Sequence, residues 1–144
     1  MQPDFANLAV QPIGAHRRKI ATAAITGEHH LDIWGDGEQT RSFMYIDDCV
    51  KGSQMILNGD SNEPVNLGSD ELVSINQLYS IVEEIAGIKC ERSYQLDAPQ
   101  GVRGRNSDNT QIMETYGWAP SISLADGLAE TYAWVYDQVK REIG

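Results

Sequence analysis

The sequence predicts a mixed α/β fold, rich in helices and with a few short strands. Helical spacing of apolar residues recurs in several segments, whereas the alternation typical of strands is confined to short runs. Capping residues and glycines separate these segments. Because a free-standing doubly wound sheet needs more strands, we expect the chain to be part of something larger or to pair with another copy.

The first third of the chain predicts a loose arm, one helix and two strands. Residues 1–12 contain two prolines and have no clear period, so we expect a loosely ordered arm. Residues 15–26 favour a helix that stops at Gly27. Alternation over 31–34 predicts a short strand, and 43–46 is a second candidate strand.

The middle of the chain predicts a helix and a buried strand. Asp47 is expected to cap a helix that runs to Leu57. Gly52 within this helix costs about 1 kcal/mol relative to alanine, so it marks close packing. Residues 64–68 predict a short buried strand that leads into a turn.

The second half predicts three helices and one strand. Ser74 and Gln77 form a capping box for a helix that Gly87 ends, and residues 90–96 predict a strand. Residues 108–111 repeat the capping pattern for a short helix, and Ser123 caps the last one. The apolar stripe of the last helix consists of Leu124, Leu128, Tyr132, Val135 and Val139.

Composition excludes several classes of function. The 144 residues, 41% hydrophobic and 22% charged, are typical of one soluble globular domain. A formal charge of −10 argues against non-specific nucleic-acid binding, and no run approaches the roughly 20 apolar residues of a membrane helix. Cys49 and Cys90 suit reduced thiols in the cytoplasm. We expect no metal at His29-His30, because neighbouring residues on a strand face opposite ways.

Two segments rich in glycine and arginine carry the functional signal. They are residues 35–43, the first arginine loop, and residues 101–109, the second arginine loop. Glycine lets the backbone approach a ligand closely, and guanidinium groups supply forked donors that suit phosphate oxygens. The alternative is two surface turns whose arginines pair with the plentiful carboxylates.

These loops predict a diphosphate site. Arg41 and Arg105, with Arg103, would donate to phosphate oxygens; at roughly 1.5–3 kcal/mol for each bond, they could hold a ligand at micromolar strength. Gln39 and Thr40 are donors and acceptors of the kind that bind sugar hydroxyls. Asn106 and Ser107 fit that role and ordinary turn chemistry equally well, and Asp108 fits a helix cap better. Lys19, in a basic run on the first helix, is a further candidate for the same anion or part of a solvated face.

Catalytic groups are few. Tyr45 with Asp47 and Asp48 suggests acid–base chemistry, but Tyr45 fits a strand pattern and Asp47 a cap. Cys49 has no histidine near it in sequence, so we do not expect a nucleophile. The Gly-x-Gly-x-x-Gly fingerprint of dinucleotide binding is absent. The residues therefore predict binding of an anion without evident machinery to transform it.

Residues 34–48 (WGDGEQTRSFMYIDD) resemble the extended short-chain dehydrogenase/reductase family of sugar-nucleotide epimerases and dehydratases. The combination of further matching stretches resembles the GDP-mannose 3,5-epimerase subgroup, over roughly Lys19 to Glu142. These stretches are Glu63–Asp70, Gly101–Asn109, and Gly117–Pro120 followed by Gly127-Leu128 and Thr131-Tyr132.

The resemblance implies the C-terminal, substrate-binding part of such an enzyme. In the family, an N-terminal Rossmann domain holds NAD and supplies the catalytic acid and base, so we expect no cofactor and no catalytic residue in this chain. Gln39, Thr40 and Arg41 match a segment that contacts the sugar nucleotide, and Arg105 matches the arginine that grips the diphosphate. Lys19 matches a phosphate-side lysine, with an altered spacing to the following tryptophan.

The implied organisation is a poorly matched arm over residues 1–16 and a sugar-nucleotide-binding domain over residues 17–144. Three hypotheses follow. The chain binds a GDP-mannose-like sugar nucleotide and is silent alone, or it completes an enzyme by docking onto a Rossmann-domain chain. The third is a self-associating module, a homo-oligomer, derived from an epimerase that has lost ligand binding.

Overall fold

The computed structural model describes residues 13–99 and 101–144, which contain five helices and four strands. The elements in order are α1 (Ile13–Thr26), β1 (His30–Trp34), β2 (Thr40–Ser42), α2 (Ile46–Leu57), β3 (Leu72–Ser74), α3 (Ile75–Ala86), β4 (Glu91–Gln95), α4 (Thr110–Tyr116) and α5 (Leu124–Ile143). The predicted class, a helix-rich α/β chain, is confirmed. The arm predicted over 1–12 lies outside the described residues.

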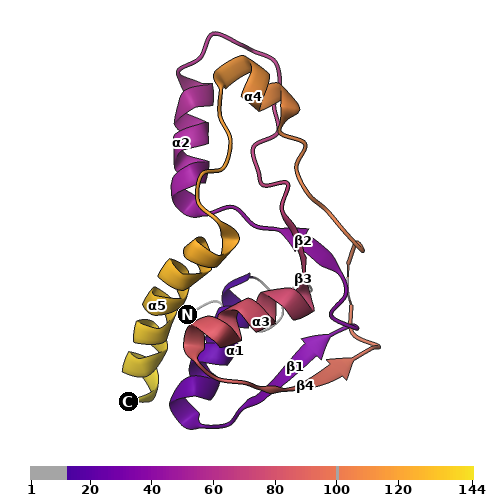
Figure 1. The fold of residues 1–144 in the computed structure, drawn as a ribbon, viewed down its shortest axis with the longest axis vertical. Coiled ribbons are helices and arrows are strands. Elements are labelled where there is room, and N and C mark those ends of the chain that lie inside the picture. The colour runs from indigo at the N-terminus through magenta and orange to yellow at the C-terminus, as the bar shows by residue number, and fades with distance from the viewer. Residues whose placement is uncertain (1–12, 100) are drawn as a thin grey trace, which may run out of the picture.

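Two small sheets organise the chain. β1 and β4 pair in parallel with His30 opposite Glu91, and β2 and β3 pair antiparallel with Thr40 opposite Ser74. Figure 1 shows α1, α3 and α5 grouped beside β1 and β4, whereas α2 and α4 lie together at the opposite end of the molecule. We call the first group the core unit. The distal unit comprises α2, residues 58–70, α4 and residues 117–123.

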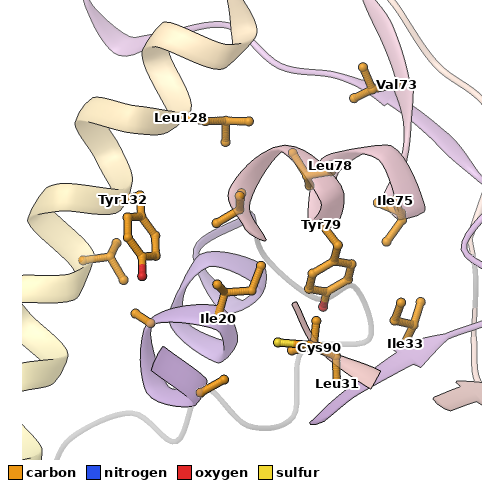
Figure 2. Packing of buried hydrophobic residues seen from close by; sticks show 14 of the residues in the cluster. Ile20, Leu31, Ile33, Val73, Ile75, Leu78, Tyr79, Cys90, Leu128 and Tyr132 are labelled. Atoms are coloured by element: carbon orange, nitrogen blue, oxygen red, sulfur yellow. The ribbon is translucent and has the colours of Figure 1, made fainter. Parts of the chain in front are cut away.

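The hydrophobic core lies within the core unit. Figure 2 shows Ile20 from α1, Leu31 and Ile33 from β1, Leu78 and Tyr79 from α3, and Leu128 and Tyr132 from α5 converging on one interior. His16 joins this interior through a 2.7 Å hydrogen bond between its Nδ1 and the hydroxyl of Tyr79. The apolar stripe predicted on the last helix is buried along its whole length. Packing of three helices on a strand pair therefore fixes the fold.

Most predicted caps are confirmed. Ser74 accepts from the amide of Gln77 and Gln77 reaches back to the amide of Ser74, so the capping box is complete. Gly87 ends α3 in the left-handed conformation, with φ of 67°. Ser123 caps α5 through the amide of Asp126. Asp108 accepts from the amide of Thr110, the first residue of α4.

Three local predictions are wrong. The second strand is Thr40–Ser42 rather than 43–46, because residues 40–42 are the ones that lie opposite β3. Residues 64–68 form no strand, because no described strand lies beside them to supply a ladder. Asp47 does not cap α2; the helix begins at Ile46, after Tyr45, without a side-chain cap.

The close packing predicted at Gly52 is confirmed. A Cβ there would meet the side chain of Leu67 and would lie 2.9 Å from Cε2 of Trp118. The absence of a side chain thus lets α2 approach the buried indole, which holds the distal unit together.

Candidate functional site

The two arginine loops are in direct contact. The amide of Thr40 donates a hydrogen bond to the carbonyl of Arg103 at 2.8 Å. A Cβ at Gly104 would lie 2.7 Å from Oγ1 of Thr40, so glycine is what allows the second loop to come this close. A Cβ at Gly101 would lie 3.5 Å from Nη2 of Arg41. Loops that are far apart in sequence therefore form one surface.

Arg41 is held within this surface. It lies opposite Val73 in the β2–β3 ladder and is half-buried. Its Nη1 donates to the carbonyl of Thr40 at 2.6 Å. The strand and this contact together place the guanidinium beside the second arginine loop.

Arg103 is engaged by a carboxylate. Its Nη1 lies 2.9 Å from Oδ2 and 3.1 Å from Oδ1 of Asp36, in the first arginine loop. The amide of Glu38, at 2.9 Å, and then Arg103 hold the pKa of Asp36 below its usual range. The predicted contact of Arg103 with an anion stays a prediction; in the structure its side chain joins the two loops.

The first arginine loop is also braced from α3, which the sequence analysis missed. Nδ2 of Asn76 donates to the side chain of Glu38 at 2.6 Å and to the carbonyl of Asp36 at 3.2 Å. The hydroxyl of Tyr94 donates to Oδ1 of Asn76 at 3.0 Å. No local pattern signals these contacts, because the partners come from separate parts of the chain.

Gln39 points inward. Its side chain is only 7% exposed, and Nε2 donates to the carbonyl of Trp34 at 2.9 Å. Its Oε1 is buried and makes no hydrogen bond among the described residues. A buried acceptor without a donor is costly, so this oxygen needs a donor that the described residues do not supply.

The second arginine loop presents Arg105 at its surface. Arg105 is exposed, and within residues 13–99 and 101–144 it forms no ion pair. The hydroxyl of Ser107 donates to Oδ1 of Asn109 at 2.8 Å, which is a contact of the turn kind. Beside this loop lies a hollow of about 740 Å³, lined in part by Asn106, Asp108 and Trp118.

Lys19 lies apart from the loops. Its Nζ donates to the carbonyl of Asp32 in β1 at 2.7 Å. It lines a separate hollow of about 400 Å³ together with Arg18 and His30, and burial lowers its pKa. None of the arginine-loop residues lines that hollow. The structure thus brings together Gln39, Thr40, Arg41 and Arg103, with Arg105 two residues farther along the second arginine loop, but not Lys19.

Asp48, considered above for acid–base chemistry, has a structural role. Asp48 is buried and accepts from the amide and hydroxyl of Ser121, at 2.9 and 2.7 Å, and from the amide of Ile122 at 2.9 Å. Burial opposes its charged form, but these bonds hold its pKa below the usual value. Asp48 therefore anchors α2 to the segment before α5.

A Tyr-x-x-x-Lys spacing that the sequence analysis passed over occurs at Tyr136 and Lys140 in α5. Tyr136 packs against the hydrophobic core, whereas Lys140 is exposed in the last turn. Tyr136 therefore has the environment of a core residue, and Lys140 that of a surface charge at the end of a helix.

Two further findings concern the described residues as a whole. No group of three or more histidine, cysteine or carboxylate side chains among them could hold a metal ion. No helix in the described ranges combines the length and apolar character needed to cross a membrane.

Comparisons with known proteins agree with the geometry. The family model described as GDP-mannose 4,6 dehydratase matches residues 11–131. The chain is 46% identical over 119 residues to GDP-mannose 3,5-epimerase 1 of Oryza sativa subsp. japonica, and 45% identical over 119 residues to GDP-mannose 3,5-epimerase of Arabidopsis thaliana. In both cases the match covers 83% of this chain and 31% of the relative, so the chain spans about a third of the length of these relatives.

Solved structures give the same result. UDP-glucuronic acid 4-epimerase from Bacillus cereus, in complex with UDP-glucuronic acid and NAD, matches 88% of this chain with a TM-score of 0.76 and 30% identity. UDP-glucose 4-epimerase from Thermotoga maritima, with UDP-glucose, matches 84% with a TM-score of 0.75 and 30% identity. The matches cover 41% and 39% of those chains. The chain therefore belongs to the GDP-mannose 4,6 dehydratase family and has the fold of part of an extended short-chain dehydrogenase/reductase epimerase.

Proposed function

We propose that residues 17–144 bind a nucleotide-diphosphate sugar, of the GDP-mannose kind, as the substrate-binding part of an NAD-dependent epimerase or dehydratase. The observation that carries this proposal is the contact between the two arginine loops, through Thr40 and Arg103. It places Arg41 and Arg105 in adjoining loops of a chain whose formal charge is −10. A local pair of guanidinium groups on such a chain suits a small anion.

Each site residue has a distinct role in this proposal. Arg41 and Arg105 donate to the diphosphate oxygens. Gln39 and Thr40 bind sugar hydroxyls, with Oγ1 of Thr40 lying where the two loops meet. Arg103 acts mainly by holding the loops together through Asp36. Lys19 would take part only if the ligand extends towards β1.

The described residues do not fit NAD. The phosphates of a dinucleotide need a glycine-rich turn between a strand and a helix N-terminus. In the described part of the chain, the strand that runs directly into a helix is β3 into α3, and Ser74 joins them without a glycine. We therefore propose that the chain is catalytically silent alone and derive no chemical step through the cofactor.

As an extension of this proposal, the chain docks onto a separate chain with a Rossmann domain and so completes an active enzyme. Ile46, Val50 and Leu57 give α2 an exposed apolar face on which such a chain could dock. The two free cysteines are consistent with the cytoplasm, the compartment that we propose.

Calorimetric titration with GDP-mannose at low salt tests the binding proposal, with UDP-glucose as the comparison. We expect GDP-mannose to bind more tightly than UDP-glucose and to weaken with added salt. Arg41→Ala and Arg105→Ala should each weaken binding about tenfold or more, whereas Arg141→Ala, in the last turn of α5, should leave it unchanged. Equal affinity in all four proteins, or no heat from a folded chain, would refute the proposal.

A second candidate function is self-association. Trp134 on α5 is 64% exposed, and Ile143 on the same helix is half exposed. Exposed tryptophans are frequent anchors of protein interfaces. If this candidate holds, sedimentation should give a homo-oligomer, and Trp134→Glu should convert it to a monomer. A monomer at high concentration would exclude it.

A further inference from the structure

Arg17 of α1 lies outside the site described above and has an unusual environment. Its Nε is buried and makes no hydrogen bond among the described residues. Burial also lowers the pKa of the guanidinium. A charged donor that loses water without gaining an acceptor is costly, so such groups normally gain a partner.

Three other arginines of the chain have a carboxylate partner. Arg18 pairs with Glu142, Arg92 with Glu83 and Arg103 with Asp36. Arg17 forms no ion pair within residues 13–99 and 101–144, although the whole chain carries 21 carboxylates. Arg105 also forms no ion pair, but it is exposed to water, whereas Nε of Arg17 is buried.

Arg17 lines a pocket of about 290 Å³ between α1, residues 43–46 and the beginning of α5. The other walls are largely apolar and include Phe43, Leu124 and Leu128. The ring of Tyr45 forms one wall and packs against Gly127, where a Cβ would come within 3.0 Å of Cδ2. The volume lies near the lower end of the about 300–1,000 Å³ typical of small-molecule sites.

The polar groups of this pocket favour an anion as the occupant. The hydroxyl of Thr131 donates to the carbonyl of Gly127 at 2.7 Å, and that of Ser123 donates to the carboxylate of Asp126 at 2.6 Å. Both hydroxyl protons are thus used within the protein, whereas the guanidinium of Arg17, which lines the pocket, has a buried Nε without an acceptor and forms no ion pair among the described residues.

We propose that this pocket binds a small organic carboxylate with an apolar body, anchored by Arg17. A carboxylate matches the planar fork of a guanidinium, and its single charge is balanced by one arginine. A phosphate dianion would need a second cation, and Arg17 is the one cationic side chain among the described residues that line the pocket. Among the described residues of the two arginine loops, Phe43 alone lines this pocket, so the arginines proposed to bind the diphosphate take no part in it.

Benzoate titrated into the full 144-residue chain and followed by NMR is the test, because the Nε–H signal of Arg17 reports on the anchor directly. We expect benzoate to shift that signal and the amides of Leu128 and Thr131. Benzamide, the neutral analogue, should bind about tenfold more weakly or not at all. Arg17→Gln should reduce benzoate affinity about tenfold or more, and Arg17→Lys by less.

Arg18→Gln is the matched control, since Arg18 is the next residue on α1 but pairs with Glu142 at the surface. It should leave benzoate binding unchanged. Thermal melting verifies that each variant is folded, and the Nε–H signal of the wild-type chain remains decisive if Arg17→Gln does not fold. Equal binding of benzoate and benzamide, shifts confined to the arginine loops, or no shift at Arg17 would each overturn the proposal.

Discussion

The core unit and the distal unit reach stability by different means. The core unit packs three helices and a strand pair around one continuous hydrophobic interior (Figure 2). The distal unit depends on a few tight contacts, chiefly Trp118 against Gly52 and the carboxylate of Asp48 on Ser121 and Ile122. The comparison teaches that one end of the molecule is held by shared burial and the other by individual contacts.

The core unit also contains a buried charge, and we expect its removal to cause the largest loss of stability. Glu83 is 2% exposed and pairs with Arg92 at 2.7 Å and Lys89 at 2.9 Å, and it accepts from the amide of Cys90. Glu83→Ala should lower the free energy of unfolding by about 3–5 kcal/mol, because it leaves the largely buried guanidinium of Arg92 without its partner.

Urea unfolding measures this effect, with Glu84→Ala as the control because Glu84 is the exposed neighbour on α3. A loss below about 1 kcal/mol would mean that Glu83 behaves as an ordinary surface ion pair.

Lowering the pH should destabilise the core unit through His16 at pH values above those at which most carboxylates take up protons. Burial, then Lys19 and Arg17, lower the pKa of His16 from 6.5 to about 4. Above pH 6.5 His16 is neutral in both states; between pH 6.5 and 4 only the unfolded chain takes up the proton. The free energy of unfolding should therefore fall by about 3 kcal/mol as the pH drops through this window.

Urea unfolding at pH 7.5, 6.0 and 5.0 measures the slope. His16→Gln should flatten it, whereas His29→Gln, an exposed histidine before β1, should not. An unchanged slope in His16→Gln would assign the acid sensitivity to other groups.

The distal unit should be sensitive to a substitution at the close contact of α2 with Trp118. Gly52→Ala adds a methyl group beside Leu67 and Trp118. We expect destabilisation of about 1–3 kcal/mol from overpacking, which outweighs the gain of about 1 kcal/mol in helix propensity.

Thermal unfolding measures the effect of Gly52→Ala, and Ser53→Ala on the exposed face of α2 is the matched control. If Gly52→Ala were instead stabilising, the indole and Leu67 would have room to move, and the distal unit would be looser than the contacts indicate.

Local signals could predict much of the fold. Ser74, Gly87 and Ser123 act on neighbouring residues, so their capping roles follow from the sequence around them. A strand, in contrast, forms only where a second strand supplies its hydrogen-bond partners. Residues 64–68 have a strand-like composition, but the described chain offers no partner for them, and composition alone cannot reveal this.

The candidate site shows the same division. Glycines and arginines pointed to the two loops, and the loops do meet at Thr40 and Arg103. The side chain of Arg103 could not be assigned, because its partner Asp36 lies in the other loop. Arg17 was hidden for a similar reason: its environment arises only when α1, residues 43–46 and α5 come together.

The parallel pairing of β1 with β4 has a consequence for how the chain folds during synthesis. The residues between these strands include α2, β3 and α3, so β1 leaves the ribosome well before the strand that completes its ladder. Such a non-local pairing has a loop-closure cost that must be met before the interior can form. The nascent core unit therefore stays open until β4 and then α5 have emerged, and in that interval a chaperone would find its apolar surface accessible.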